Sequence, residues 1–145
     1  MALRVAETRI RLQQDIAERA RVQQALETSA EEYRSMFNAS IDGLALWNAE
    51  AEMVDANPAL WRMYGYSEEE RLASTPSRLA GPSYRPDVLR SIDSAKPVHA
   101  GITETRKDGS TRDIEVHAIP MQYQGNPHVL TIARDVTDEK RSAEE

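Results

Sequence analysis

The sequence predicts an α+β domain, in which one five-stranded antiparallel sheet carries short helices on one face and a long helix precedes the sheet. Three observations support this fold class. The first 42 of the 145 residues contain no glycine or proline, apolar residues alternate after Gly101, and turn-forming pairs separate the later segments. A segment without helix breakers indicates a long helix, and alternation between turns indicates strands. At this length we expect one domain with an appended element.

Residues 1–37 are rich in Ala, Arg, Gln, Glu and Leu, and they carry six acidic and six basic residues. Such a segment is expected to form one helix. A heptad repeat places mostly apolar residues along one seam, which includes Val5, Leu12, Ile16, Leu26 and Tyr33. Arg9, Arg19 and Gln23 interrupt the seam, which favours a dimeric coiled coil of marginal stability. The alternative is a solvated helix that lies on its own domain.

Short elements follow the long helix. Residues 44–47 and 53–56 predict two strands, Asn57-Pro58 begins a helix that Gly65 ends, and Ser67 with Glu70 predicts a capped helix over 68–72. Four prolines between positions 76 and 97 leave room for one helix over 87–94. Residues 102–107, 112–119 and 129–136 form a predicted meander of strands. Thr137 is expected to cap a last helix, which is still running at residue 145, so we expect the natural protein to continue.

Composition excludes several classes of chemistry. The chain has no cysteine, so disulfides, thiolate catalysis, cysteine-ligated zinc and sulfur-linked chromophores are excluded. The net charge of −6 argues against binding to nucleic acid, which needs a basic face. No apolar run is long enough for a membrane span and no secretory signal is visible, so we predict a cytoplasmic location without direct membrane insertion of this segment.

Six short motifs, in this order, resemble a PAS domain of bacterial signal-transduction proteins. They are Tyr33–Phe37, Asp42-Gly43, Asn57–Ala59, Gly65–Glu69, Arg106–Ser110 and Asp135–Arg141. The resemblance covers residues 31–141, and the segment before it resembles the coiled linkers of sensor histidine kinases and diguanylate cyclases. One departure is the turn at 49–52, which lacks the glycine usual in the family, so a longer or distorted turn is expected there.

The resemblance implies three regions: a signalling helix over 1–37, a PAS domain over 38–136 and the start of an output helix over 137–145. It also implies a ligand cavity between the sheet and the short helices. The candidate lining residues are Leu44, Leu46, Trp61, Ile102, Val116 and Ile132. Trp61 is the best candidate because an aromatic ring can stack on a planar ligand. At the output junction the resemblance implies Asp135 and Thr137, with Lys107 or Arg106 as the partner of Asp135; the two could equally serve only as helix caps.

The identity of a cofactor stays open. Flavin photosensors and thioester-linked chromophores of this family need a cysteine, and haem-binding members use a histidine in the helix predicted over 87–94, which contains none. A non-covalent flavin or a small organic ligand is compatible with the sequence. His99, His117 and His128 lie 18 and 11 residues apart, which is not a metal-ligand pattern, so no metal site is predicted. We expect all three at the surface, with His99 in a loop.

The predicted function is a sensory or regulatory module, not an enzyme, which forms a homodimer and relays a ligand or partner signal through its flanking helices to a downstream output domain. The alternative is a constitutive dimerisation or docking domain without a ligand. A small α+β enzyme with Glu104, Glu115 or His117 as general base is disfavoured, because the alternation of the strands predicts that water surrounds these side chains.

Overall fold

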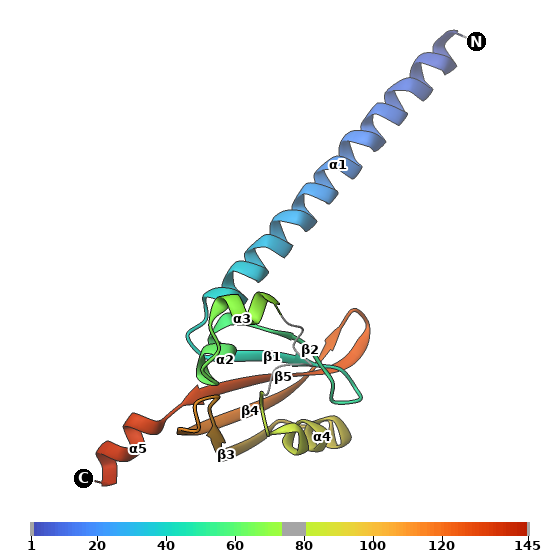
Figure 1. Cartoon of the computed structure of the whole chain (residues 1–145). Coiled ribbons are helices and arrows are strands. Elements are labelled where there is room, and N and C mark those ends of the chain that lie inside the picture. Colours follow the sequence, from blue (N-terminus) through green and yellow to red (C-terminus); the bar gives the residue numbers. More distant parts are fainter. Residues whose placement is uncertain (1, 74–80, 145) are drawn as a thin grey trace. The chain divides into compact units, whose positions relative to one another are not determined.

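The computed structural model describes residues 2–73 and 81–144. The chain divides into two compact units, Met1–Phe37 and Asn38–Glu145. Helix α1 spans Ala2–Ala39 and accounts for the first unit (Figure 1). The long helix expected from the start of the sequence is therefore present, and it ends two residues later than predicted. Among the described residues, no helix has a stretch long and apolar enough to cross a lipid bilayer.

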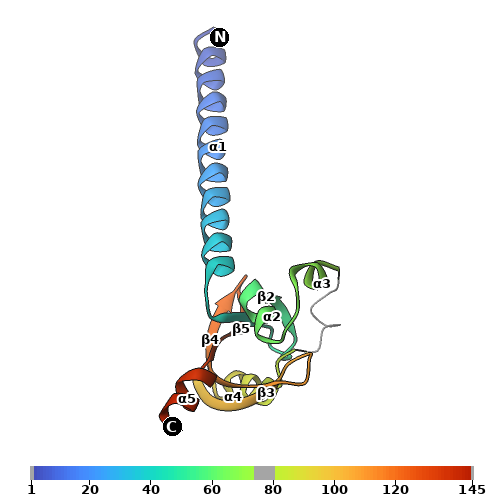
Figure 2. The same cartoon turned by 60° about the vertical axis from the view of Figure 1, so that its left-hand side comes forward.

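The second unit is built on one five-stranded antiparallel sheet. Its strands are β1 (Gly43–Trp47), β2 (Met53–Ala56), β3 (Val98–Thr105), β4 (Thr111–Tyr123) and β5 (Asn126–Asp135). They lie in the order β2-β1-β5-β4-β3, so the last strand in sequence is central and pairs with the first (Figures 1 and 2). Strands β3, β4 and β5 form the expected meander. The predicted fold class is confirmed.

Helices α2 (Pro58–Met63), α3 (Glu68–Ala73) and α4 (Arg85–Ser94) connect the two parts of the sheet. Helix α2 contacts β1, and α4 contacts β3, β4 and β5. Large side chains fill the space between these two helices and the sheet. Tyr84, Leu60 and Val88 are each at most 1% exposed, and Trp47 packs edge-on against Tyr84 with ring centroids 5.9 Å apart. The indole Nε1 of Trp47 donates to Thr131 Oγ1 at 2.9 Å, so this buried N–H has a partner.

Asn57 joins α2 to β1 through one fully buried side chain. Its Oδ1 accepts hydrogen bonds from the amides of Leu60 (3.1 Å) and Leu44 (2.8 Å), and its Nδ2 donates to the carbonyl of Asp42 (3.0 Å). The predicted helix cap is confirmed, and the same side chain also fixes the start of β1. Gly43 permits the close approach, because a Cβ there would lie 2.9 Å from Leu60 Cδ1.

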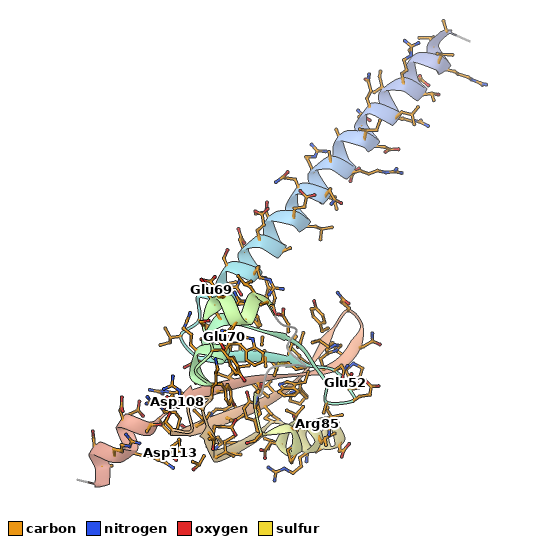
Figure 3. All side chains as sticks on the ribbon, in the orientation of Figure 1. Glu52, Glu69, Glu70, Arg85, Asp108 and Asp113 are labelled. Atoms are coloured by element: carbon orange, nitrogen blue, oxygen red, sulfur yellow. The ribbon has the colours of Figure 1, made fainter. Side chains whose placement is uncertain are left out.

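The turn between β1 and β2 has the distortion expected from its missing glycine. Ala51 has a φ of 58°, a left-handed conformation that glycine adopts more easily. The side chain of Asn48 stabilises the turn, since its Oδ1 accepts from the amides of Glu50 (3.0 Å) and Glu52 (2.9 Å). Arg85 of α4 donates to the carbonyl of Ala51 at 3.1 Å, and Figure 3 shows Arg85 on the same side of the domain as Glu52.

Four of the five strands are longer than predicted; β1 and β5 begin at Gly43 and Asn126 instead of residues 44 and 129. Strand β3 begins at Val98 instead of residue 102, and β4 runs to Tyr123 instead of residue 119. The ladder between them continues through Gly101, which pairs with Glu115, so cross-strand pairing overrides the local preference of glycine for turns. The prediction that His99 lies in a loop is therefore wrong. Residues 74–80, which include the first of the four clustered prolines, lie outside the described part of the chain.

Candidate functional site

The end of the sheet is joined to α5 (Thr137–Glu144) by a small set of hydrogen bonds. Thr137 is 1% exposed; its hydroxyl donates to Asp135 Oδ1 (2.6 Å) and accepts from the amide of Asp113 (2.8 Å). The amide of Thr137 also donates to Asp135 Oδ1 (3.0 Å), and the amide of Val136 donates to the carbonyl of Asp113 (2.9 Å). Figure 3 shows Asp113 at the end of the sheet where α5 begins. One threonine thus connects β4, β5 and α5.

This geometry makes the first turn of α5 depend on the sheet. The carboxylate that accepts the first amide of α5 belongs to Asp135, while Thr137 is the first helical residue and directs its hydroxyl to β4. The early amides of a helix lack partners within the helix, so such bonds decide whether its first turn is ordered. A displacement of β4 relative to β5 would break the bonds of Thr137 and loosen that turn.

Arg112 is the basic residue that pairs with Asp135. Its Nη1 lies 3.8 Å from Asp135 Oδ2, and both side chains are about one-third exposed. Ile114 is the register partner of Asp135, so Arg112 occupies the diagonal position on the same face of the sheet. The predicted pairing of Asp135 with Lys107 or Arg106 is wrong, because the hairpin between β3 and β4 directs those two residues to other elements.

Lys107 and Arg106 hold this hairpin against α2 and α3. The amide of Lys107 donates to the carbonyl of Tyr64 at 2.8 Å, and its ammonium forms an ion pair with Glu70, which Figure 3 labels on α3. The hydrogen bond from Lys107 is the main reason that the pKa of the Glu70 carboxyl lies below its ordinary value. Arg106 Nη2 donates to the carbonyl of Arg62 at 3.4 Å. These contacts fix the position of the helices relative to the meander.

The six predicted cavity residues do not share one surface. Val116 belongs to the apolar cluster that the helices cover, and the partly buried Ile102 packs against that cluster. Side chains alternate between the two faces along a strand. The neighbours Ala45, Trp47 and Ala133 belong to the cluster. The opposite face therefore carries Leu44, Leu46 and Ile132. A ligand between the sheet and the helices would therefore contact Val116 and Ile102 but not the three strand residues on the opposite face.

Trp61 is 3% exposed but lies outside the apolar cluster. Its ring packs edge-on against Tyr66, with centroids 6.0 Å apart. Together with Pro58 and Arg62 it lines a surface cavity of about 420 Å³ beside α2. The residue expected to stack on a ligand therefore lies outside the apolar cluster between the helices and the sheet.

The described core is occupied by protein side chains. Tyr84, Leu60 and Val88 fill the region where a non-covalent flavin or small organic ligand was considered. Binding of such a molecule between α4 and the sheet requires these side chains to move.

Glu104 is buried, although the alternation of the strand predicted that it faces water. It is 4% exposed, and its carboxylate accepts hydrogen bonds from the hydroxyl of Tyr64 and from the amide (3.1 Å) and hydroxyl of Ser83. Burial, followed by the neighbouring Tyr84 and the bond to Glu104, raises the pKa of Tyr64 above its ordinary value. Three donors satisfy the carboxylate, so Glu104 joins β3 to the end of α2 and to the segment before α4.

The predicted dimer seam of α1 is exposed in the single chain. Its members are 44–66% exposed: Val5, Leu12, Ile16, Leu26 and Tyr33. Exposed apolar residues also occur off the seam, at Leu3, Ile10 and Val22. A helix with this much exposed apolar surface gains stability if a partner covers part of it. Self-association of α1 stays a prediction.

The chain belongs to the PAS family, since the model of the PAS fold matches residues 31–136. It is similar to the diguanylate cyclase DgcM of Escherichia coli strain K12, with 29% identity over 100 residues, 66% of this chain and 24% of that protein. It is also similar to the sensor histidine kinase TmoS of Ectopseudomonas mendocina, with 26% identity over 141 residues, 89% of this chain and 14% of that protein. The chain thus spans a quarter or less of the length of these relatives.

Solved structures show the same fold. The PAS domain of an HTR-like protein from Haloarcula marismortui superposes with a TM-score of 0.61, at 24% identity, over 80% of this chain and 98% of that one. The LOV protein of Rhodobacter sphaeroides gives a TM-score of 0.58 at 20% identity, over 80% of this chain and 71% of that one. The PAS domain is a sensory, non-catalytic module of signalling proteins.

Proposed function

We propose that this chain is a regulatory PAS module that passes a change in its sheet to α5, and through α5 to the output domain of its parent protein. The observation that carries the proposal is the buried hydroxyl of Thr137, which bonds β4 and β5 at once. Coupling of this kind requires a structural element with two conformations, and contacts elsewhere in the molecule must be able to favour one of the two. The first turn of α5 is such an element, because its order depends on contacts with two strands.

The proposal includes a cytoplasmic homodimer formed through α1. Its seam is exposed, and Arg9, Arg19 and Gln23 interrupt it. Polar residues in such a seam lower the stability of a coiled coil and bring alternative registers closer in energy. The similarity to a diguanylate cyclase and to a sensor histidine kinase supports an output domain of one of these two kinds.

The relay is tested by fusing residue 145 to the cyclase domain of the similar Escherichia coli protein and measuring the rate of cyclic di-GMP synthesis. Thr137→Val removes the hydroxyl at nearly constant side-chain volume. Asp135→Asn removes the negative charge of the carboxylate that accepts two hydrogen bonds from Thr137. We expect each variant to change the synthesis rate several-fold. Thr105→Val, at an exposed position near the end of β3, is the matched control and should leave the rate unchanged.

Circular dichroism and thermal unfolding show whether each variant is folded. Folded Thr137→Val and Asp135→Asn fusions that synthesise product at the rate of the unaltered fusion would rule out the relay. An equal effect of Thr105→Val would also contradict it, because that residue has no part in the junction.

The filled core favours a second candidate function, a docking or dimerisation domain without a ligand. Tyr84, Leu60 and Val88 leave this core closely packed in the described residues. Native mass spectrometry of protein purified from its own host distinguishes the two functions. A bound small molecule would contradict the second function, whereas an apo mass together with an unresponsive Thr137→Val fusion would favour it.

A further inference from the structure

Three potential metal ligands meet on the sheet face opposite to the one that α2 and α4 cover. His99 of β3 and His117 of β4 are direct cross-strand partners, and their rings stack with centroids 4.3 Å apart and planes 13° apart. Glu115 lies two residues before His117 on the same face, and its Oε1 is 2.7 Å from His99 Nε2. One ligand atom from each residue can be chosen so that all three lie within 4.8 Å of one another. His99 and His117 are 18 residues apart in the sequence, and only the pairing of β3 with β4 brings them together.

We infer that His99, Glu115 and His117 form a surface site for one divalent transition-metal ion of the kind that imidazole binds well, such as Zn²⁺. Two imidazoles with one carboxylate are a recurrent ligand set for such ions, and they leave at least one coordination position open. Zn–N and Zn–O bonds of about 2.0–2.2 Å place the ligands of a tetrahedral ion roughly 3.3 Å apart. The side chains of His99 and Glu115 are 55% and 40% exposed, so rotation about their side-chain bonds can close the remaining gap.

The site lies next to the output helix. His99 and Glu115 line a cavity of about 350 Å³ together with Glu139, Lys140 and Ala143 of α5. Glu139 lines the same space, and its Oε1 lies 3.1 Å from Arg134 Nη2. An ion at His99 and Glu115 would share this cavity with Glu139, whose negative charge favours the approach of that side chain of α5 to the ion. This consequence for α5 rests on the proposed function, whereas the metal site itself does not.

Binding is tested with Zn²⁺ added to the metal-free, tag-free chain. Isothermal titration calorimetry should give one ion per chain, and NMR should show shifts of the imidazole signals of His99 and His117 but not of His128. His99→Gln, His117→Gln and Glu115→Gln should each weaken binding at least about tenfold, because loss of even an outer-shell partner costs about 10–100-fold. The chain has no cysteine that could bind the ion instead.

His128→Gln is the matched control, because His128 lies on β5 outside the cluster and its Nδ1 is 3.0 Å from the carbonyl of Asn126. It should bind Zn²⁺ as the unaltered chain does. Absence of binding, or equal weakening by His128→Gln and His99→Gln, would overturn the site. Each variant changes an exposed or half-exposed residue, so thermal unfolding should confirm that it stays folded.

Hydrogen exchange of the α5 amides separates the two inferences. We expect Zn²⁺ to slow exchange over residues 137–143, and Glu139→Gln to reduce this effect. Binding without any change in α5 would overturn the link to the output helix and leave the site standing. Lack of binding would overturn the site and leave the relay through Thr137 untouched.

Discussion

Tyr64 donates its phenolic hydroxyl to the carboxylate of Glu104, and both residues are buried, at 2% and 4% exposure. This hydrogen bond joins the end of α2 to β3, two elements about 40 residues apart in sequence. A buried carboxylate is tolerated only when donors satisfy it, and here Ser83 provides the others. The contact therefore holds the helices on the sheet.

Tyr64→Phe should destabilise the domain by about 1.5–3 kcal/mol, because it removes a buried hydrogen bond to a charged group. Urea unfolding at pH 7, followed by tryptophan fluorescence, measures this change. Tyr123→Phe, at the half-buried end of β4, is the control and should change the free energy of unfolding by less than about 0.5 kcal/mol. Equal effects of the two variants would show that the bond to Glu104 contributes little.

The same contact predicts a loss of stability at alkaline pH. The pKa of Tyr64 is raised in the folded state, chiefly by burial, so the folded chain keeps this phenol neutral. In the unfolded chain the phenol ionises near its ordinary pKa of about 10. The stabilising contribution is thus complete below pH 10 and is lost as the pH rises above that value. Urea midpoints at pH 8 and pH 11 should differ less in Tyr64→Phe than in the unaltered chain, and an equal difference would exclude Tyr64 as a cause.

Substitution by alanine should have different effects on stability at Gly43 and at Gly101. A Cβ at Gly43 would lie 2.9 Å from Leu60 Cδ1 and 3.0 Å from Met63 Sδ, whereas a Cβ at Gly101 meets nothing within 4 Å. Gly43→Ala should cost about 1–3 kcal/mol through overpacking. Gly101→Ala should be neutral or stabilise the strand by up to about 1 kcal/mol. Thermal unfolding of the two variants checks the pair, and a stable Gly43→Ala variant would show that α2 can move away from β1.

The ion pair between Lys107 and Glu70 predicts a change that NMR can follow. Lys107→Met should raise the pKa of the Glu70 carboxyl toward its ordinary value, because the bond from Lys107 is the largest cause of its lowering. Titration of the Glu70 side-chain carbon signal measures the shift. Arg71→Gln is the control, since Arg71 lies 3.8 Å from Glu68. A pKa that does not respond to Lys107→Met would show that the hairpin does not hold α3 through this pair.

The dimer prediction is tested with two exposed isoleucines of α1. Ile16 lies on the predicted seam and is 66% exposed, whereas Ile10 lies off it and is 53% exposed. If the seam mediates dimerisation, Ile16→Glu should weaken the dimer at least about tenfold, while Ile10→Glu should have little effect, because only seam positions are buried between helices. Sedimentation equilibrium measures the dissociation constant of the dimer. A monomeric unaltered chain, or equal weakening by the two variants, would contradict the seam.

Much of the fold follows from local signals. Asn57 with Pro58 predicts the start of α2, Asp108 with Gly109 predicts the hairpin between β3 and β4, and the absence of breakers predicts α1. These signals act between residues close in sequence, through capping, turn geometry and helix propensity. The same locality explains an error, because Gly101 resembles a strand boundary until its pairing with Glu115 is known.

The candidate sites depended more strongly on tertiary structure. The order of motifs pointed to Asp135 and Thr137 as the output junction, but not to Arg112 as the ion-pair partner or to Asp113 as the donor from β4. The alternation of side chains along each strand shows which residues share a face of the sheet, but it does not show which of the two faces the helices cover. The predicted cavity set therefore mixed Val116 with Leu44 from the opposite face.

The sequence by itself determined the class of fold, the exclusion of cysteine chemistry and the point where the last strand gives way to the last helix, because composition, caps and turns are local properties. Only the tertiary structure decided which residues meet across strands. It buried Glu104 beneath Tyr64, and it brought His99 and His117 into contact from positions 18 residues apart. The physical reason is that sheet register and helix placement arise from the packing of the whole core, which no short segment encodes.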